Sequence, residues 1–111
     1  MAENKEPLQS EKWPSYSMVE PRMRKIYFNF YRETYKSSTI DRKTKELIAI
    51  AASLGFKCEG CLEGHLEKAL KHGATKEEIS EAVAIAMGVG AASVVDQTDH
   101  VAEKLQTRHF E

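Results

Sequence analysis

The chain has no excess of charge of one sign and no long apolar run. Acidic and basic residues are interspersed over 30% of its 111 positions, and the formal net charge is -1. Nucleic-acid-binding proteins mostly present a basic surface, so we expect no nucleic-acid partner. No apolar stretch approaches the roughly 20 residues of a membrane span, and residues 1–12 lack the features of a signal peptide. We therefore expect a cytoplasmic protein with no membrane partner.

The chain also lacks the alternation of apolar and polar residues that is typical of strands. No segment of useful length has a period of two, whereas apolar residues recur three and four positions apart. We therefore predict an all-α protein with a flexible N-terminal arm over residues 1–17 and one helical domain over residues 18–111. The arm carries Trp13 and Tyr16 as isolated aromatic residues. It is either mobile, as most untethered termini are, or docked on its own or a neighbouring subunit.

Four helices are predicted from the apolar periodicity and the capping residues. Asp41 and Thr75 are suitable N-caps, and Gly73 is a suitable C-terminal stop. Gly88 and Gly90 are expected to interrupt the last helix, because glycine weakens a helix interior. The predicted helices cover about residues 20–36, 42–55, 58–72 and 76–105.

Only two cysteines are present, and they form a Cys58-Glu-Gly-Cys61 motif with His65 four residues later. A bridge that closes so short a loop constrains the unfolded chain little, which disfavours a purely structural disulfide. A helix N-terminus favours the thiolate, which is the form that attacks peroxides and disulfides. The two cysteines, the histidine and three apolar residues share one face of the predicted helix: Cys58, Cys61, Leu62, His65, Leu66 and Ala69. The sequence thus predicts a reactive dithiol with a base on the same helix face.

Glu46 lies twelve residues before Cys58, at the edge of the apolar stripe of the second helix. From periodicity alone it is an ordinary carboxylate in the first turn of a helix. A turn near Gly55 would make the second and third helices antiparallel and would let Glu46 reach inward. The residues permit this arrangement without requiring it.

Glu46, the Cys58-x-x-Cys61 pair and His65, at this spacing, resemble the signature of the alkylhydroperoxidase D-like group within the carboxymuconolactone decarboxylase superfamily. The similarity extends over about residues 40–105. It implies an all-helical, obligately oligomeric fold, commonly a trimer or hexamer. It also implies an antioxidant oxidoreductase, namely a thiol-dependent hydroperoxide reductase with peroxiredoxin-type activity and no cofactor or metal.

The same resemblance assigns roles to the residues. It makes Cys61 the attacking thiol and Cys58 the resolving thiol, with Glu46 and His65 as a proton relay. The implied partners are a hydroperoxide substrate and an external dithiol reductant, either lipoyl or thioredoxin-like. One departure is that Gly60 stands where the alkylhydroperoxidase D proteins proper carry a further histidine, so this relay is shorter. Lactone decarboxylation is not expected, because the decarboxylase branch typically lacks the cysteine pair.

Two other functions stay open from the residues alone. One is a zinc-binding structural module with ligands from Cys58, Cys61, His65 and either Glu46 or His72, although zinc-binding pairs of this type mostly lie in knuckle turns. The other is a redox sensor in which the dithiol responds to peroxide without turnover. Asp96 and His100, four residues apart, are interpreted as a surface ion pair.

Overall fold

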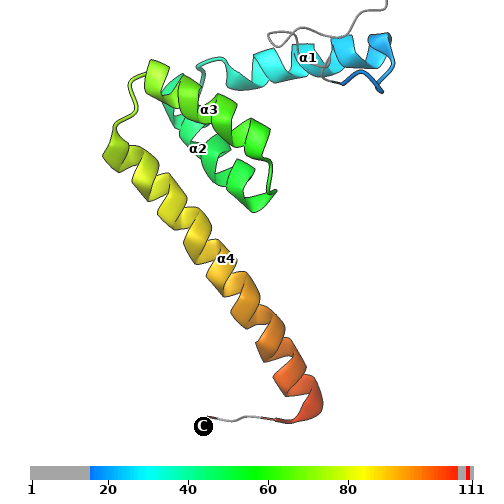
Figure 1. Ribbon diagram of the computed structural model, residues 1–111, viewed down its shortest axis with the longest axis vertical. Helices are drawn as coiled ribbons and strands as arrows, with labels where there is room; N and C mark the ends of the chain where they lie inside the picture. The colour runs from blue at the N-terminus through cyan, green and yellow to red at the C-terminus, as the bar shows by residue number, and fades with distance from the viewer. Residues whose placement is uncertain (1–15, 108–109, 111) are drawn as a thin grey trace, which may run out of the picture. The chain divides into compact units, whose positions relative to one another are not determined.

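The computed structural model describes residues 16–107 and residue 110. The described residues form four helices and no strand: α1 (Pro21–Tyr35), α2 (Arg42–Gly55), α3 (Glu59–Lys71) and α4 (Lys76–Leu105) (Figure 1). The prediction of an all-α fold is confirmed. The predicted arm lies outside the described residues except for residues 16 and 17. The chain divides into two compact units, residues 1–34 and residues 35–111, and the division falls in the last turn of α1.

Within the described residues, the first unit comprises the turn at residues 16–19 and α1 as far as residue 34. The side chain of Glu20 accepts a hydrogen bond from the backbone N–H of Arg22 at 2.7 Å, which satisfies one of the free donors at the helix start. Aromatic rings then gather along the helix: Tyr16 lies 5.3 Å from Tyr27 and 5.2 Å from Phe28, measured between ring centroids. These rings stabilise the turn before the helix against its second and third turns.

The second unit is built on the antiparallel pair α2 and α3, which lie side by side in Figure 1. Asp41 caps α2 as predicted, because its carboxylate accepts the N–H of Thr44 at 2.7 Å. The same N–H lowers the pKa of Asp41 below its ordinary value. Four buried residues from α2, α3, the turn after α3 and α4 form a small core: Ile50, Ala69, Ala74 and Ala82. Partly buried leucines, Ile79 and Val83 pack against this core.

The N-terminal part of α4 packs on α2 and is fixed there by polar contacts. Thr75 and Glu78 form the predicted capping box, in which each side chain accepts the backbone N–H of the other residue. Glu78 also accepts a hydrogen bond from the ammonium of Lys43 on α2 at 3.0 Å. The backbone N–H of Thr75, and then the ammonium of Lys43, hold the pKa of Glu78 below its ordinary value.

The predicted interruption of α4 at Gly88 and Gly90 is wrong, because α4 is one continuous helix of 30 residues. A glycine in a helix interior costs about 1 kcal/mol relative to alanine, but a break would free several backbone hydrogen bonds from their partners. Neither glycine has a positive φ. Neither would bring a Cβ atom within 4 Å of another part of the described chain, so no close approach explains them here.

The C-terminal two-thirds of α4 leaves many large apolar side chains exposed: Ile85, Met87, Val89, Val94, Val95, Val101 and Leu105. An 18-residue window of α4 has a mean hydropathy of 1.5, and 6% of it is buried. By length and composition alone this helix could cross a membrane, but the core helix of a soluble protein passes the same test, so the absence of a membrane partner stays a prediction. Exposed apolar surface of this kind also marks protein–protein contacts.

Candidate dithiol site

A tight turn between α2 and α3 places the cysteines. α2 ends at Gly55, and Phe56 closes it with a backbone N–H bond to the carbonyl of Ala52. The helix ends at Gly55 as predicted, and the left-handed residue of the turn is Lys57, with φ of 57°. The backbone N–H of Cys58 then bonds to the carbonyl of Ser53 at 2.9 Å. This bond holds the start of α3 against the end of α2.

Cys58 is the N-cap of α3, and its sulfur accepts the backbone N–H of Cys61 at 3.3 Å. The two cysteines form a disulfide, with Cα atoms 5.2 Å apart. Cys58 is half-buried and Cys61 is exposed. The structure therefore brings the two predicted sulfurs into bonding contact at a helix N-terminus, with the second of them open to solvent.

Glu46 and His65 meet inside the α2–α3 pair. Oε1 of Glu46 lies 2.7 Å from Nδ1 of His65. Glu46 is 0% exposed and His65 is 8% exposed, so both polar side chains are buried. Burial of an unpaired carboxylate is costly, and this pairing reduces that cost. The antiparallel arrangement that the sequence permitted is the one that the structure has, while the role of the pair as a relay stays a prediction.

Sequence reasoning missed Arg42, which is the second partner of Glu46. Its Nε donates to Oε2 of Glu46 at 2.7 Å, so that each oxygen of the buried carboxylate has a partner. Arg42 and Glu46 are four residues apart on α2, and this spacing is the signal that would have identified the pair.

Sequence reasoning also missed Tyr35, the last residue of α1 and the first residue of the second unit. Its hydroxyl lies 3.4 Å from Nε2 of His65, and its ring stacks on the imidazole with centroids 5.1 Å apart and planes at 27°. The guanidinium carbon of Arg42 lies 5.9 Å from the centroid of the Tyr35 ring. Thirty residues separate Tyr35 from His65, so no local spacing pointed to this contact.

Cys61 and His65 belong to neighbouring turns of α3, four residues apart. The predicted common stripe is only partly correct, because His65 and Ala69 are buried while Cys61 is exposed. The proton transfer from Cys61 to His65 stays a prediction.

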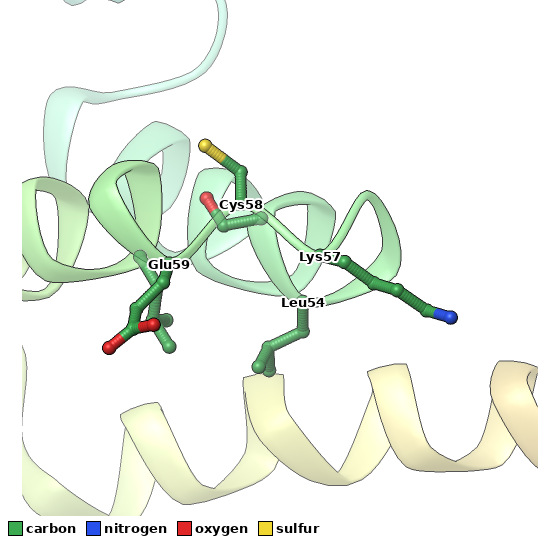
Figure 2. A pocket seen from close by; sticks show the side chains of 6 residues that line it. Leu54, Lys57, Cys58 and Glu59 are labelled. Atoms are coloured by element: carbon green, nitrogen blue, oxygen red, sulfur yellow. The ribbon is translucent and has the colours of Figure 1, made fainter.

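A hollow of about 220 Å³ lies beside the turn and is lined by Ser53, Leu54, Lys57, Cys58, Glu59 and Leu62. Figure 2 shows Leu54 and Glu59 pointing toward α4, whereas the sulfur of Cys58 points away from them. Cys58 lines the hollow, although its sulfur points away from Leu54 and Glu59 in this view. The exposed side of Cys61 is the approach to the disulfide.

The other polar candidates are separate from this site. His72 is exposed and forms the C-cap of α3. Nδ1 of His100 lies 3.7 Å from the carboxylate of Asp96, with both side chains exposed, which agrees with a surface ion pair. Over residues 16–107 and residue 110, no group of three or more His, Cys, Asp or Glu side chains is arranged to hold a metal ion.

The fold and the site together define an all-α protein with a Cys-x-x-Cys disulfide beside a buried Glu–His pair. Comparison with known families adds that residues 21–104 match the model of the carboxymuconolactone decarboxylase family. The chain belongs to this family.

Similar proteins fall into two groups. Among curated proteins, uncharacterized protein 4 in cox locus of Paracoccus denitrificans is 42% identical over 60 residues, which is 52% of this chain and 54% of that protein. An uncharacterized protein of Cupriavidus necator is 28% identical over 72 residues, which is 65% of this chain and 64% of that protein. The chain thus spans about half to two-thirds of the length of these curated relatives.

Solved structures cover more of the chain. A carboxymuconolactone decarboxylase family protein of Thermotoga maritima, described in connection with an antioxidative response, has a TM-score of 0.61 and 34% identity, with 77% of this chain and 91% of that chain covered. A protein of Methanobacterium thermoautotrophicum has a TM-score of 0.68 and 28% identity, with 73% and 91% covered. A family member of Legionella pneumophila has a TM-score of 0.60 and 32% identity, with 62% of each chain covered.

Proposed function

We propose that this protein is a thiol-dependent hydroperoxide reductase. The observation that carries the proposal is the Cys58–Cys61 disulfide at the start of α3, four residues before a histidine whose Nδ1 is held by Glu46. A dithiol that closes to a disulfide, next to an oriented base, is what reduction of a peroxide by thiols needs. Membership of the carboxymuconolactone decarboxylase family agrees with it, as does the description of the Thermotoga relative.

The first half of the cycle consumes the peroxide. In the reduced protein, Nε2 of His65 takes the proton of the Cys61 thiol, because Nδ1 donates to Glu46. The Cys61 thiolate attacks the terminal oxygen of the hydroperoxide and the O–O bond breaks. Cys61 becomes a sulfenic acid, and the alkoxide leaves as an alcohol with the proton from His65.

The second half restores the dithiol. The Cys58 thiol attacks the sulfenic sulfur of Cys61, which forms the disulfide seen in the structure and releases water. An external dithiol of the lipoyl or thioredoxin type then reduces this disulfide by two exchange steps and is itself oxidised to a disulfide. The sum is one hydroperoxide and one external dithiol converted to alcohol, water and one external disulfide.

The assembly that goes with this function is a homo-oligomer, a trimer or hexamer, in the cytoplasm. It is supported by the exposed apolar side chains of α4, which a small domain leaves uncovered.

The direct test is the consumption of tert-butyl hydroperoxide by the purified protein with dithiothreitol as reductant. The wild type is expected to turn over many times and the Cys61→Ser variant to lose activity, whereas the Cys58→Ser variant, treated with peroxide without dithiothreitol, is expected to accumulate sulfinic acid at Cys61. The wild type should also lose two hydrogens per chain after mild oxidation. Disulfide formation without turnover would instead identify a redox sensor, and equal activity of Cys61→Ser would contradict the proposed chemistry.

A further inference from the structure

His65 and three other side chains form a closed circuit of contacts. Arg42 donates to Glu46, and Glu46 holds Nδ1 of His65, both at 2.7 Å. The Tyr35 hydroxyl lies 3.4 Å from Nε2 of His65, and Tyr35 stacks on the imidazole. The guanidinium of Arg42 lies 5.9 Å from the centroid of the Tyr35 ring, within the range of a cation–π contact. Each of the four residues thus touches two of the others.

The mechanism above uses Glu46 and His65 and gives no role to Tyr35 or Arg42. We propose that Tyr35 is a positioning residue for His65 whose hydroxyl stabilises the protonated imidazole, and that Arg42 holds Glu46 and the Tyr35 ring in the geometry that this requires. This inference rests on the proposed function, in which His65 receives the proton of Cys61.

The chemistry of a tyrosine hydroxyl suits this position, because it both donates and accepts hydrogen bonds. When His65 is neutral with its proton on Nδ1, the Tyr35 O–H donates to the lone pair of Nε2. For His65 to accept the thiol proton on Nε2, the Tyr35 hydroxyl first turns its hydrogen away and frees the Nε2 lone pair, and the new N–H then donates to the Tyr35 oxygen. The contact of 3.4 Å is long, as catalytic hydrogen bonds often are in a resting state.

The two states do not gain equally from the hydroxyl. Hydrogen bonds with a charged donor are roughly twice as strong as neutral ones, so the Tyr35 oxygen favours the imidazolium over the neutral imidazole. The Glu46 carboxylate acts in the same sense as the Tyr35 oxygen, whereas the Arg42 guanidinium bound to Glu46 acts in the opposite sense; Cys61 lies one turn away on α3. Loss of the hydroxyl should therefore make His65 a weaker base for Cys61.

The test measures the pH dependence of Cys61 alkylation by iodoacetamide in the full-length protein. A Cys58→Ser background leaves Cys61 as the only thiol, because the chain has two cysteines. Tyr35→Phe keeps the stacked ring and removes only the hydroxyl. Tyr27→Phe is the matched control, because the ring of Tyr27 packs on aromatic rings of the first unit. His65→Ala reports whether His65 serves Cys61 at all.

We expect Tyr35→Phe to slow alkylation at pH 7 by about fivefold, from the difference between a charged and a neutral hydrogen bond. The deficit should vanish above about pH 9.5, where the thiol ionises without help. Tyr27→Phe should match the background protein. An unchanged pH profile for Tyr35→Phe, with His65→Ala slow, would overturn the inference and leave the proposed function intact. A His65→Ala protein as fast as the background would instead contradict the relay itself.

Discussion

The α2–α3 pair and the distal part of α4 depart from the usual rule of burial in opposite directions. Inside the pair, Glu46 is fully buried and His65 nearly so. Along α4, in contrast, Val94 is 60% exposed and Val95 is 53% exposed. Buried charge costs free energy unless it is paired, and exposed apolar surface leaves hydrophobic stabilisation unused. Within the described residues, the α2–α3 pair has partners for its buried polar groups, whereas the distal part of α4 leaves its apolar side chains exposed.

The buried polar groups and the exposed apolar groups therefore have different explanations. The polar groups of the pair are explained within the chain, because Arg42, Glu46, His65 and Tyr35 satisfy one another. The exposed apolar side chains of α4 are not explained within the described residues, and we propose that another copy of the chain covers them.

Removal of Glu46 should have the largest effect on stability. Glu46→Ala leaves Arg42 and His65 without their carboxylate partner in a buried site and creates a cavity, so it should lower the free energy of unfolding by about 3–5 kcal/mol. Urea unfolding followed by circular dichroism measures this. The control is Glu63→Ala on the exposed side of α3, for which a change of less than about 0.5 kcal/mol is expected. Similar effects of both variants would show that the buried network contributes little.

Charged substitutions among the exposed apolar residues of α4 should dissociate the proposed oligomer and leave the subunit folded. Val94→Glu and Val95→Glu each lose the burial of a valine, worth about 1.5 kcal/mol, and should each raise the dissociation constant of the oligomer at least about tenfold. Light scattering over a dilution series measures the oligomeric state. Glu103→Gln, near the end of the same helix, is the control. A wild type that is monomeric at micromolar concentration would contradict the proposed assembly, and vesicle binding would favour a membrane contact for this face.

Removal of the N-cap of α4 should have an intermediate effect on the free energy of unfolding. Thr75→Ala removes the acceptor for the N–H of Glu78 and should lower the free energy of unfolding by about 1 kcal/mol. Urea unfolding at pH 7 measures the loss. Thr44→Ala, also in the first turn of a helix but exposed and not a cap, should change it less.

The same turn predicts a pH dependence with a definite sign. The N–H of Thr75 and the ammonium of Lys43 lower the pKa of Glu78 in the folded protein from the ordinary value of 4.5. Its stabilising contribution is therefore complete above the unfolded pKa and is lost as the pH falls through the lower folded pKa. Unfolding midpoints between pH 6 and pH 2 should fall less steeply in Glu78→Gln than in the wild type. Glu77→Gln controls for the lost charge, and equal slopes in all three proteins would contradict the assignment.

The smallest effect is expected at Lys57 in the turn before α3, and Gly73 in the turn after α3 provides a contrast in sign. Lys57 has φ of 57° and Gly73 has φ of 90°, so both adopt the left-handed conformation that favours glycine. Lys57→Gly should raise the free energy of unfolding by up to about 1 kcal/mol, whereas Gly73→Ala should lower it by about 1–2 kcal/mol. Thermal unfolding distinguishes the two signs. A loss of stability in Lys57→Gly would show that the lysine side chain, rather than the backbone, determines the turn.

The sequence predicted the local parts of this structure better than the long-range ones. Asp41 and Thr75 cap helices as predicted, because capping depends on residues three apart. The continuity of α4 through Gly88 was missed, because a local propensity is outweighed by the many hydrogen bonds around it. Lys57 was missed as the left-handed residue, because only the packing of α3 on α2 requires that conformation there.

The candidate site also has a local part, which the sequence predicted, and a long-range part, which it did not. The proximity of Cys58 and Cys61 follows from their spacing, and the reach of Glu46 to His65 follows from an antiparallel pair that the sequence permitted. Tyr35 has no such signal, since it approaches His65 from a segment thirty residues earlier. Contacts of this kind are fixed by tertiary packing and not by periodicity.

The central proposal is that the buried Glu46–His65 pair accepts the proton of Cys61 and so activates this thiol. It is tested by the rate at which the reduced protein reacts with tert-butyl hydroperoxide, measured across pH for the wild type, Glu46→Gln, His65→Ala and the double variant. We predict that each single variant reacts at least about tenfold more slowly at pH 7, and that the double variant is little worse, because the two residues act as one unit. A Glu46→Gln protein that folds and matches the wild type at every pH would contradict the claim.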